Sequence, residues 1–136
     1  MITSSLTGNV AMQKILILNV DDNLSARYAK TRVLQNAGFR VEEAEDGGAA
    51  LTMVEQLMPS LVLLDVKLPD ISGHEVCRRI KANPMTGNVL VLQISAALIS
   101  DDDSARGIES GADCYLAAPF EPRDLVSNVR ALLRAH

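Results

Sequence analysis

Short apolar runs alternate with longer amphipathic stretches from Lys14 onward. The apolar runs are too short for typical helices and are bounded by polar residues, which is typical of buried parallel strands. Because parallel strands need crossover connections, this alternation predicts an α/β domain with a parallel sheet between layers of helices. Strands are expected at 15–18, 39–44, 61–65, 89–94 and 114–116, and helices at 24–37, 49–57, 73–80, 101–110 and 121–134.

Five strand–helix units in one domain favour a doubly wound (βα)5 sheet of order 2-1-3-4-5. The second strand is the more polar, so it is expected at an edge of the sheet. The first helix has a cap at Asn23 and a stop at Gly38. Its core side is expected to carry the apolar residues of the helix, which are Leu24, Ala26, Tyr28, Val33, Leu34 and Ala37.

The chain has the length and composition of one soluble domain. It has 136 residues, of which 48% are hydrophobic and 22% charged. Residues 1–13 are polar and rich in Ser and Thr, so they are interpreted as a flexible leader before a domain at 14–136. No apolar run reaches the ~20 residues of a membrane span, and the start lacks the pattern of a signal peptide. These features predict a cytoplasmic location.

Charge and cysteine content narrow the classes of partner. The formal net charge of −4 disfavours direct binding to nucleic acid or to an anionic membrane, since both favour a basic surface. Cys77 and Cys114 lie far apart, with no second Cys or His at ligand spacing. They are therefore interpreted as small apolar residues in a reducing compartment rather than as a zinc site or a disulfide.

Polar side chains follow three of the predicted strands at their carboxyl ends. Asp21 and Asp22 follow the first strand, Asp65 ends the third, and Ser95 follows the fourth. In open α/β sheets the ligand binds outside this edge, so these residues should converge there. Converging carboxylates raise one another's pKa, and oxygen ligands of this kind suit Mg²⁺. A carboxylate beside Mg²⁺ can attack a phosphoryl donor, although a lone Asp after a strand can also be a helix cap.

Four segments in order along the chain resemble the motifs of response-regulator (CheY-like) receiver domains of two-component systems. They are Asn19–Asn23, Leu63–Asp70, Ile94–Ala96 and Tyr115–Phe120. The resemblance covers the chain from about Lys14 to Arg134 and implies a flavodoxin-like fold.

The resemblance also implies roles for the residues at the strand ends. Asp65 would accept a phosphoryl group from a histidine kinase or a phosphotransfer protein, in a reaction that depends on Mg²⁺. Asp22 would bind the metal directly and Asp21 through water, with Asp65 and the backbone carbonyl of Lys67 as further ligands. Such a domain is not an enzyme in the usual sense, because it catalyses only its own phosphotransfer and dephosphorylation.

Two further residues would transmit the signal. Ser95 would be the switch hydroxyl, and Tyr115 the aromatic side chain that changes rotamer when Ser95 moves. The alternative for Tyr115 is a half-buried aromatic residue at the edge of the sheet.

The chain departs from the family pattern at Ala118, where receivers carry a lysine before the proline of the last loop. In the family that lysine pairs with the phosphoacceptor and then with the phosphoryl group. The side chain of Lys67 is the nearby candidate to replace it, and the alternative is a solvated loop lysine. We therefore expect a domain that binds Mg²⁺ and is phosphorylated but transmits the event weakly or by an unusual route.

Two rival functions remain open. The first is a pseudo-receiver, a protein-docking module without regulated phosphorylation, which the absence of the lysine favours. The second is an enzyme of the haloacid-dehalogenase type. These phosphatases use an Asp-x-Asp pattern, whereas Lys67 stands where the second acid should be.

The sequence leaves the assembly open. The chain is interpreted as a stand-alone receiver or as a piece of a longer protein, such as a hybrid sensor kinase. A homodimer through the fourth helix, fifth strand and fifth helix is a further expectation. His74 is interpreted as a surface or helix-packing residue.

Overall fold

The computed structural model describes residues 15–96 and 110–136. The predicted leader at 1–13 and residues 101–109 of the expected fourth helix lie outside these ranges. The strands are β1 (Leu16–Val20), β2 (Arg40–Ala44), β3 (Leu61–Asp65), β4 (Leu90–Ala96) and β5 (Cys114–Ala118). The helices are α2 (Leu24–Asn36), α3 (Gly47–Leu57), α4 (Gly73–Ala82) and α6 (Pro122–Ala135).

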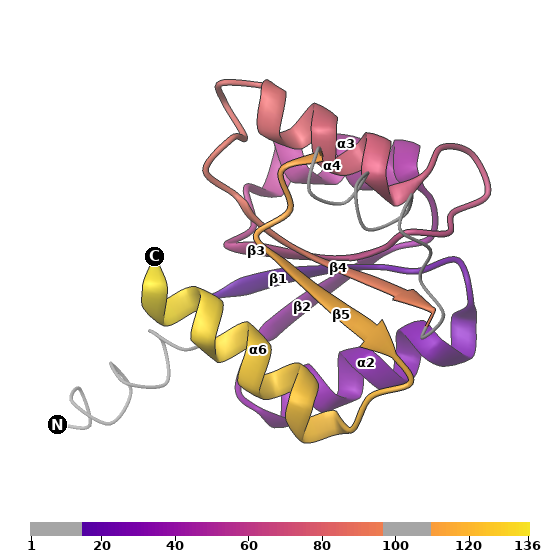
Figure 1. Cartoon of the computed structure of the whole chain (residues 1–136), viewed down its shortest axis with the longest axis vertical. Coiled ribbons are helices and arrows are strands. Elements are labelled where there is room, and N and C mark those ends of the chain that lie inside the picture. Colours follow the sequence, from indigo (N-terminus) through magenta and orange to yellow (C-terminus); the bar gives the residue numbers. More distant parts are fainter. Residues whose placement is uncertain (1–14, 97–109) are drawn as a thin grey trace, which may run out of the picture.

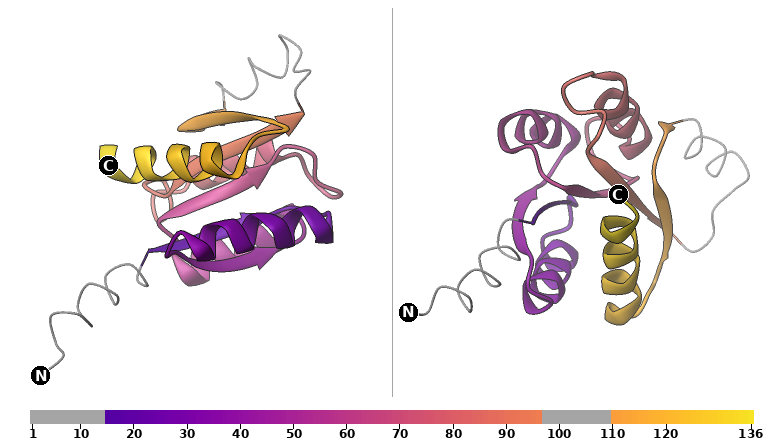
Figure 2. Two further views of the ribbon diagram at one scale, coloured as in Figure 1. Left: turned by 90° about the horizontal axis from the view of Figure 1, so that it is seen from below. Right: turned by 90° about the vertical axis from the view of Figure 1, so that its left-hand side faces the viewer.

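The five strands form one parallel sheet in the order β2-β1-β3-β4-β5. This confirms the predicted order and places the polar strand β2 at an edge. Figures 1 and 2 show three layers, with α3 and α4 on one face of the sheet and α2 and α6 on the other. No helix of residues 15–96 and 110–136 is long and apolar enough to cross a membrane.

Two hydrophobic clusters fill the space on either side of the sheet. Successive residues of a strand point to opposite faces, so each strand contributes to both clusters. Leu18 of β1 and Leu64 of β3 pack with Val54 of α3 and Val76 of α4. On the other face, Ile17, Leu63 and their neighbours pack against Leu34, Leu125 and Val129 of α2 and α6. The sheet is thereby buried on both sides, which explains the unbroken apolar runs in the sequence.

The ends of α2 lie where the sequence places them. The side chain of Asn23 accepts a hydrogen bond from the backbone N–H of Ala26, and Gly38 has the left-handed backbone (φ 99°) of a residue that follows a helix.

The predicted core face of α2 is wrong in part. Leu24 and Tyr28 are 70% and 59% exposed, whereas Lys30 and Thr31 are buried beside Leu34. The reason lies in the strands beneath the helix. Thr31 binds Asn19 of β1 and Glu43 of β2, and Lys30 pairs with Asp21. Because these sheet positions are polar, the helix presents polar partners to them, and its apolar pattern alone does not define its buried side.

Candidate functional site

The register of the sheet brings the polar strand ends together. Val20 lies opposite Leu64, and Asp65 lies opposite Ile94. Asp21 and Asp22 follow β1 directly, so they reach the same edge as Asp65. One carboxylate oxygen from each of these three residues lies within 4.8 Å of the other two.

Asp21 is buried and held by two partners. Its Oδ1 accepts a hydrogen bond from the backbone N–H of Asn23 at 2.9 Å, and its Oδ2 pairs with Lys30 Nζ at 2.9 Å. Both side chains of this ion pair are largely inaccessible, with 10% of Lys30 and 6% of Asp21 exposed. Asp22, by contrast, is exposed and points to the open side of the cluster.

The environment of Asp65 perturbs the ionisation of its carboxyl group. Burial and, next, the negative charge of Asp21 raise the pKa of Asp65 to about 6. The backbone N–H of Lys67, 3.3 Å from Asp65 Oδ1, and the positive charge of Lys30 act in the opposite direction. A perturbed carboxyl group in a cavity is a common property of functional sites.

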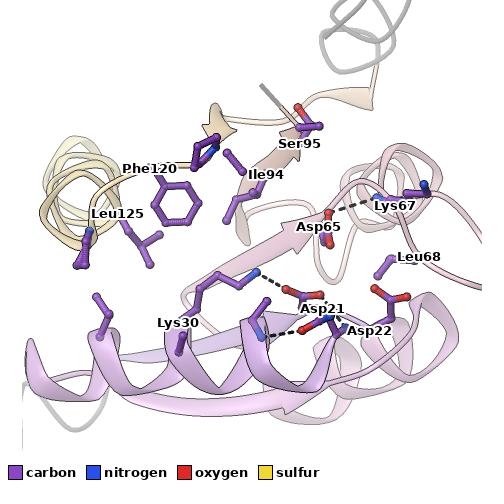
Figure 3. Close-up of a pocket in the computed structure, with 18 of the residues that line it drawn as sticks. Asp21, Asp22, Lys30, Asp65, Lys67, Leu68, Ile94, Ser95, Phe120 and Leu125 are labelled. Atoms are coloured by element: carbon purple, nitrogen blue, oxygen red, sulfur yellow. Dashed lines mark hydrogen bonds and ion pairs between the residues drawn. The ribbon is translucent and has the colours of Figure 1, made fainter. Parts of the chain in front are cut away.

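A cavity of about 690 Å³ opens over the three carboxylates. Its acidic end is lined by Asp21, Asp22 and Asp65, the amine of Lys30 extends into it, and Lys67 is a further lining residue (Figure 3). The rest of the wall is formed mainly by small and apolar side chains of α2, β4, the end of β5, the loop before α6 and α6 itself, among them Ala29, Val33, Ile94, Ala118, Phe120 and Leu125.

Ser95 adds an unsatisfied hydroxyl to this cavity. Its Oγ is buried and has no hydrogen-bond partner in the described structure. A buried polar atom without a partner is rare in folded proteins, and the residue that carries this one lines the same cavity as Asp65. A change of its side-chain rotamer would bring this hydroxyl to an anionic group bound in the cavity.

The loop between β3 and α4 is fixed at both ends. Asp70 accepts hydrogen bonds from the backbone N–H groups of Gly47 and Gly48, each at 2.8 Å. These bonds, the largest influences on the group, lower the pKa of Asp70 to about 2. A second contact joins the two ends of the loop, where the backbone N–H of Gly73 donates to the carbonyl oxygen of Val66 at 2.7 Å. The segment that carries Lys67 is therefore tied to the first turns of α3 and α4.

Tyr115 lies apart from the carboxylate cluster and is not among the residues that line the cavity. Its hydroxyl is 3.3 Å from His74 Nε2, and His74 Nδ1 lies 3.1 Å from Gln93 Oε1. His74 is only 8% exposed, so of the two expectations for it, helix packing holds and a surface position is wrong. The physical reason is that the fully buried Gln93 of β4 gives the imidazole a polar partner inside the fold.

Lys30 is the charged residue of the cavity that was not predicted from the sequence. Its signal was a cation among small apolar residues on one side of a helix, beside Ala26, Ala29 and Val33, which all line the same cavity. A lysine at such a position is either a long stem that reaches solvent or a buried ion pair. Only the fold shows that it is the second.

The donor set fits a hard divalent cation. Carboxylate oxygens are the ligands that Mg²⁺ and Ca²⁺ take in proteins, and Asp22 and Asp65 provide them on the open side of the cluster. Both oxygens of Asp21 already hold a donor, which suits an indirect role for this residue.

Comparison with known proteins gives concordant results. Residues 17–130 match the family model described as the response regulator receiver domain. The DNA-binding response regulator MtrA of Mycobacterium tuberculosis is 43% identical over 122 residues, which cover 90% of this chain and 51% of MtrA. This chain thus spans about half the length of the curated relatives it matches.

Solved structures agree with this match. The receiver domain protein (CheY-like) of Methanospirillum hungatei superposes with a TM-score of 0.82 at 28% identity, over 88% of this chain and 94% of that one. The signal receiver domain of a histidine kinase from Syntrophus aciditrophicus gives 0.83 at 28% identity, over 88% and 90%. Sequence, fold and acidic strand ends lead to one conclusion: this chain belongs to the response regulator receiver domain family.

Proposed function

We propose that this domain accepts a phosphoryl group on Asp65 from the phosphohistidine of a histidine kinase or a phosphotransfer protein. The observation that carries the proposal is the cluster itself. Three carboxylates lie within 4.8 Å of one another at the strand ends, and the half-buried Asp65 is among them. Ser95, with its unpaired buried hydroxyl, borders the same cavity.

A magnesium ion is the proposed cofactor. Asp22, Asp65 and the backbone carbonyl of Lys67 would hold it, and Asp21 would act indirectly, because both of its oxygens already accept a hydrogen bond or an ion pair. When bound, Mg²⁺ neutralises negative charge on the transferring phosphoryl group.

The chemistry on the protein side is a single displacement. A carboxylate oxygen of Asp65 attacks phosphorus, and a new O–P bond forms as the P–N bond of the donor breaks. The bonding electron pair stays with the imidazole of the donor, which takes up a proton. The Ser95 hydroxyl donates a hydrogen bond to a phosphoryl oxygen, and this bond satisfies the hydroxyl that is unpaired in the described structure. The domain thus both accepts the phosphoryl group and catalyses the transfer.

Signal transmission is proposed to be weak or atypical. Ala118 lines the cavity where receivers carry a lysine, and its methyl group offers no hydrogen bond to a phosphoryl oxygen. A hydrogen bond to a charged group contributes about 1.5–3 kcal/mol, and coupling between two sites is typically about 1–3 kcal/mol. The loss of that one bond is therefore large compared with the coupling energy, whereas phosphorylation depends chiefly on Asp65 and the metal.

The partners and location of the whole protein are proposals as well. We assign this domain to kinase recognition in the cytoplasm rather than to nucleic acid, because the chain is acidic overall. Where relatives such as MtrA are named as DNA-binding, half of their length lies beyond the part matched by this chain. Pairing through the face of the fourth helix, β5 and α6 stays a prediction, since residues 97–109 are outside the described ranges.

Intact mass after incubation with acetyl phosphate and Mg²⁺ tests the proposal. We expect a gain of one phosphoryl group that requires the metal, disappears in Asp65→Asn, and persists in Glu45→Gln, which removes an exposed carboxylate elsewhere. If the wild-type protein gains no mass under conditions that modify an ordinary receiver, the proposal fails. The remaining function would then be that of a docking module.

A further inference from the structure

Lys30 is a cation in an unusual place. It lies in the middle of α2, yet only 10% of its side chain is exposed, and its amine extends into the cavity toward Asp21 (Figure 3). Its neighbours on the cavity wall are Ala26, Ala29 and Val33, among which an apolar side chain would pack without any desolvation penalty. Burial of an ammonium group is unfavourable unless it is paired, so its presence calls for an electrostatic role.

The charges of the cavity explain what that role is. Three carboxylates face one another within 4.8 Å, and their mutual repulsion also opposes the approach of an anionic phosphoryl donor. Of the residues that line the cavity, Lys30 and Lys67 are the cations, and Lys67 is exposed on the loop after β3. Of these two, Lys30 is the one that is buried with the carboxylates; Arg27 of the same helix is also largely buried, but it pairs with Glu43 and donates to the backbone carbonyl oxygen of Asp21. When the three carboxylates are ionised, the single positive charge of Lys30 leaves the cluster with two excess negative charges. This excess is equal in size to the charge of one magnesium ion.

The influence of Lys30 extends beyond its ion-pair partner. Asp21, which Lys30 Nζ holds at 2.9 Å, lies in one cluster with Asp65, and Lys30 lines the same cavity as Asp65. An ammonium group has three N–H donors, and the bond to Asp21 uses one of them. The opposite wall of the cavity, at Ala118, carries no charge. Any compensation of charge that Asp65 receives from the protein interior therefore comes from α2.

We propose that Lys30 is the cation that supports phosphorylation of Asp65, by holding Asp21 in place and by offsetting the charge of the phosphoryl group. This inference rests on the proposed function. It assigns to a residue of α2 an electrostatic role for which Ala118, at the end of β5, has no charged side chain. A lysine introduced at position 118, on the opposite wall of the same cavity, should then be able to replace it.

The test compares four proteins as full chains: wild type, Lys30→Met, Lys30→Met with Ala118→Lys, and Arg32→Met. Met keeps the length of the side chain without its charge, and Arg32→Met removes an exposed positive charge from the same helix. The initial rate of phosphorylation by acetyl phosphate at low donor concentration is measured by intact mass. Mg²⁺ affinity is measured by calorimetry without a phosphoryl donor.

We expect the two measurements to move in opposite directions in Lys30→Met. The rate of phosphorylation should fall by about tenfold or more, the size of one lost charge-assisted bond. Mg²⁺ affinity should rise by about two- to fivefold, because a competing cation is gone from the acidic cluster. Ala118→Lys should restore most of the rate, and Arg32→Met should change neither quantity.

Other outcomes overturn the inference. If Lys30→Met is phosphorylated as fast as the wild type, Lys30 plays no part in the reaction. If it loses both Mg²⁺ binding and phosphorylation, and Ala118→Lys restores neither, its role is in folding. These results are distinct from failure of the proposed function. In that case the wild-type protein itself takes up no phosphoryl group, and both proposals lose their basis.

Discussion

Gly73 lies against the end of the strand that carries Asp65. A methyl group on its Cα would overlap the carbonyl oxygen of Asp65 and lie 2.7 Å from Val66 Cα. The first turn of α4 can approach β3 this closely only because Gly73 has no side chain, and its N–H uses the approach to bind Val66. The position of the acceptor strand end thus depends on a residue with no chemistry of its own.

Gly73→Ala should therefore destabilise the fold despite the higher helix propensity of alanine. The clash is with backbone, which cannot move aside as a flexible side chain can, so we expect a loss of about 2–3 kcal/mol in the free energy of unfolding. Urea denaturation measures it. Gly48→Ala is the matched control in α3, where the nearest atom is a side-chain oxygen of Asp70 at 3.3 Å, and it should change stability by less than about 1 kcal/mol. Equal effects of the two variants would contradict this account.

Ser95→Ala should stabilise the unphosphorylated domain. The hydroxyl of Ser95 is buried and has no partner among residues 15–96 and 110–136, so its removal relieves a desolvation penalty of about 1 kcal/mol or more. Thr86→Val provides the comparison, because Thr86 Oγ1 is also buried but donates to the carbonyl oxygen of Ile80 at 2.8 Å. That variant should lose about 1 kcal/mol. The prediction is wrong if both substitutions destabilise the protein equally in thermal or urea unfolding without a phosphoryl donor.

The stability of the metal-free protein should depend on pH through Asp65. The pKa of Asp65 is about 6 in the folded state against an ordinary value of 3.8, so the folded state binds the proton more tightly. Stability therefore falls as pH rises from about 4 to about 6, and the loss is complete above that range. Because Asp65 is partly exposed, solvent screening reduces the effect to about 1–2 kcal/mol.

Asp65→Asn should abolish this dependence. In EDTA at pH 8 the variant should be the more stable protein by the same amount, and the two proteins should converge near pH 4. Urea denaturation at a series of pH values measures both. A difference that stays constant with pH would show that the gain in the variant has another cause.

Mg²⁺ should stabilise the domain through Asp22. A ligand that binds only the folded state raises the free energy of unfolding by about 2.7 kcal/mol at 100 times its dissociation constant. We expect thermal unfolding of the wild type to shift upward as Mg²⁺ is added, and Asp22→Asn to lose most of the shift. Glu45→Gln, which removes an exposed carboxylate outside the cluster, should retain it. An undiminished shift in Asp22→Asn would mean that the metal binds elsewhere.

The sequence alone determined the sheet and the acidic edge. Buried parallel strands are continuous apolar runs, and these runs are visible in the sequence. Because the carboxyl ends of such strands meet at one edge of the sheet, the sequence alone predicts that Asp21, Asp22 and Asp65 lie together. The cap at Asn23 and the stop at Gly38 were equally local, because they depend on the conformations of single residues.

Tertiary structure decided which side chains face the cavity. The buried side of α2 depends on what lies beneath it, and the polar residues Asn19 and Glu43 of the sheet select Thr31 while leaving Tyr28 exposed. Lys30 joins the site for the same reason, since its partner Asp21 follows the end of the strand that precedes the helix. Apolar periodicity reports the average environment of a helix face, whereas a buried ion pair is a contact between two particular residues, and only the packed fold fixes it.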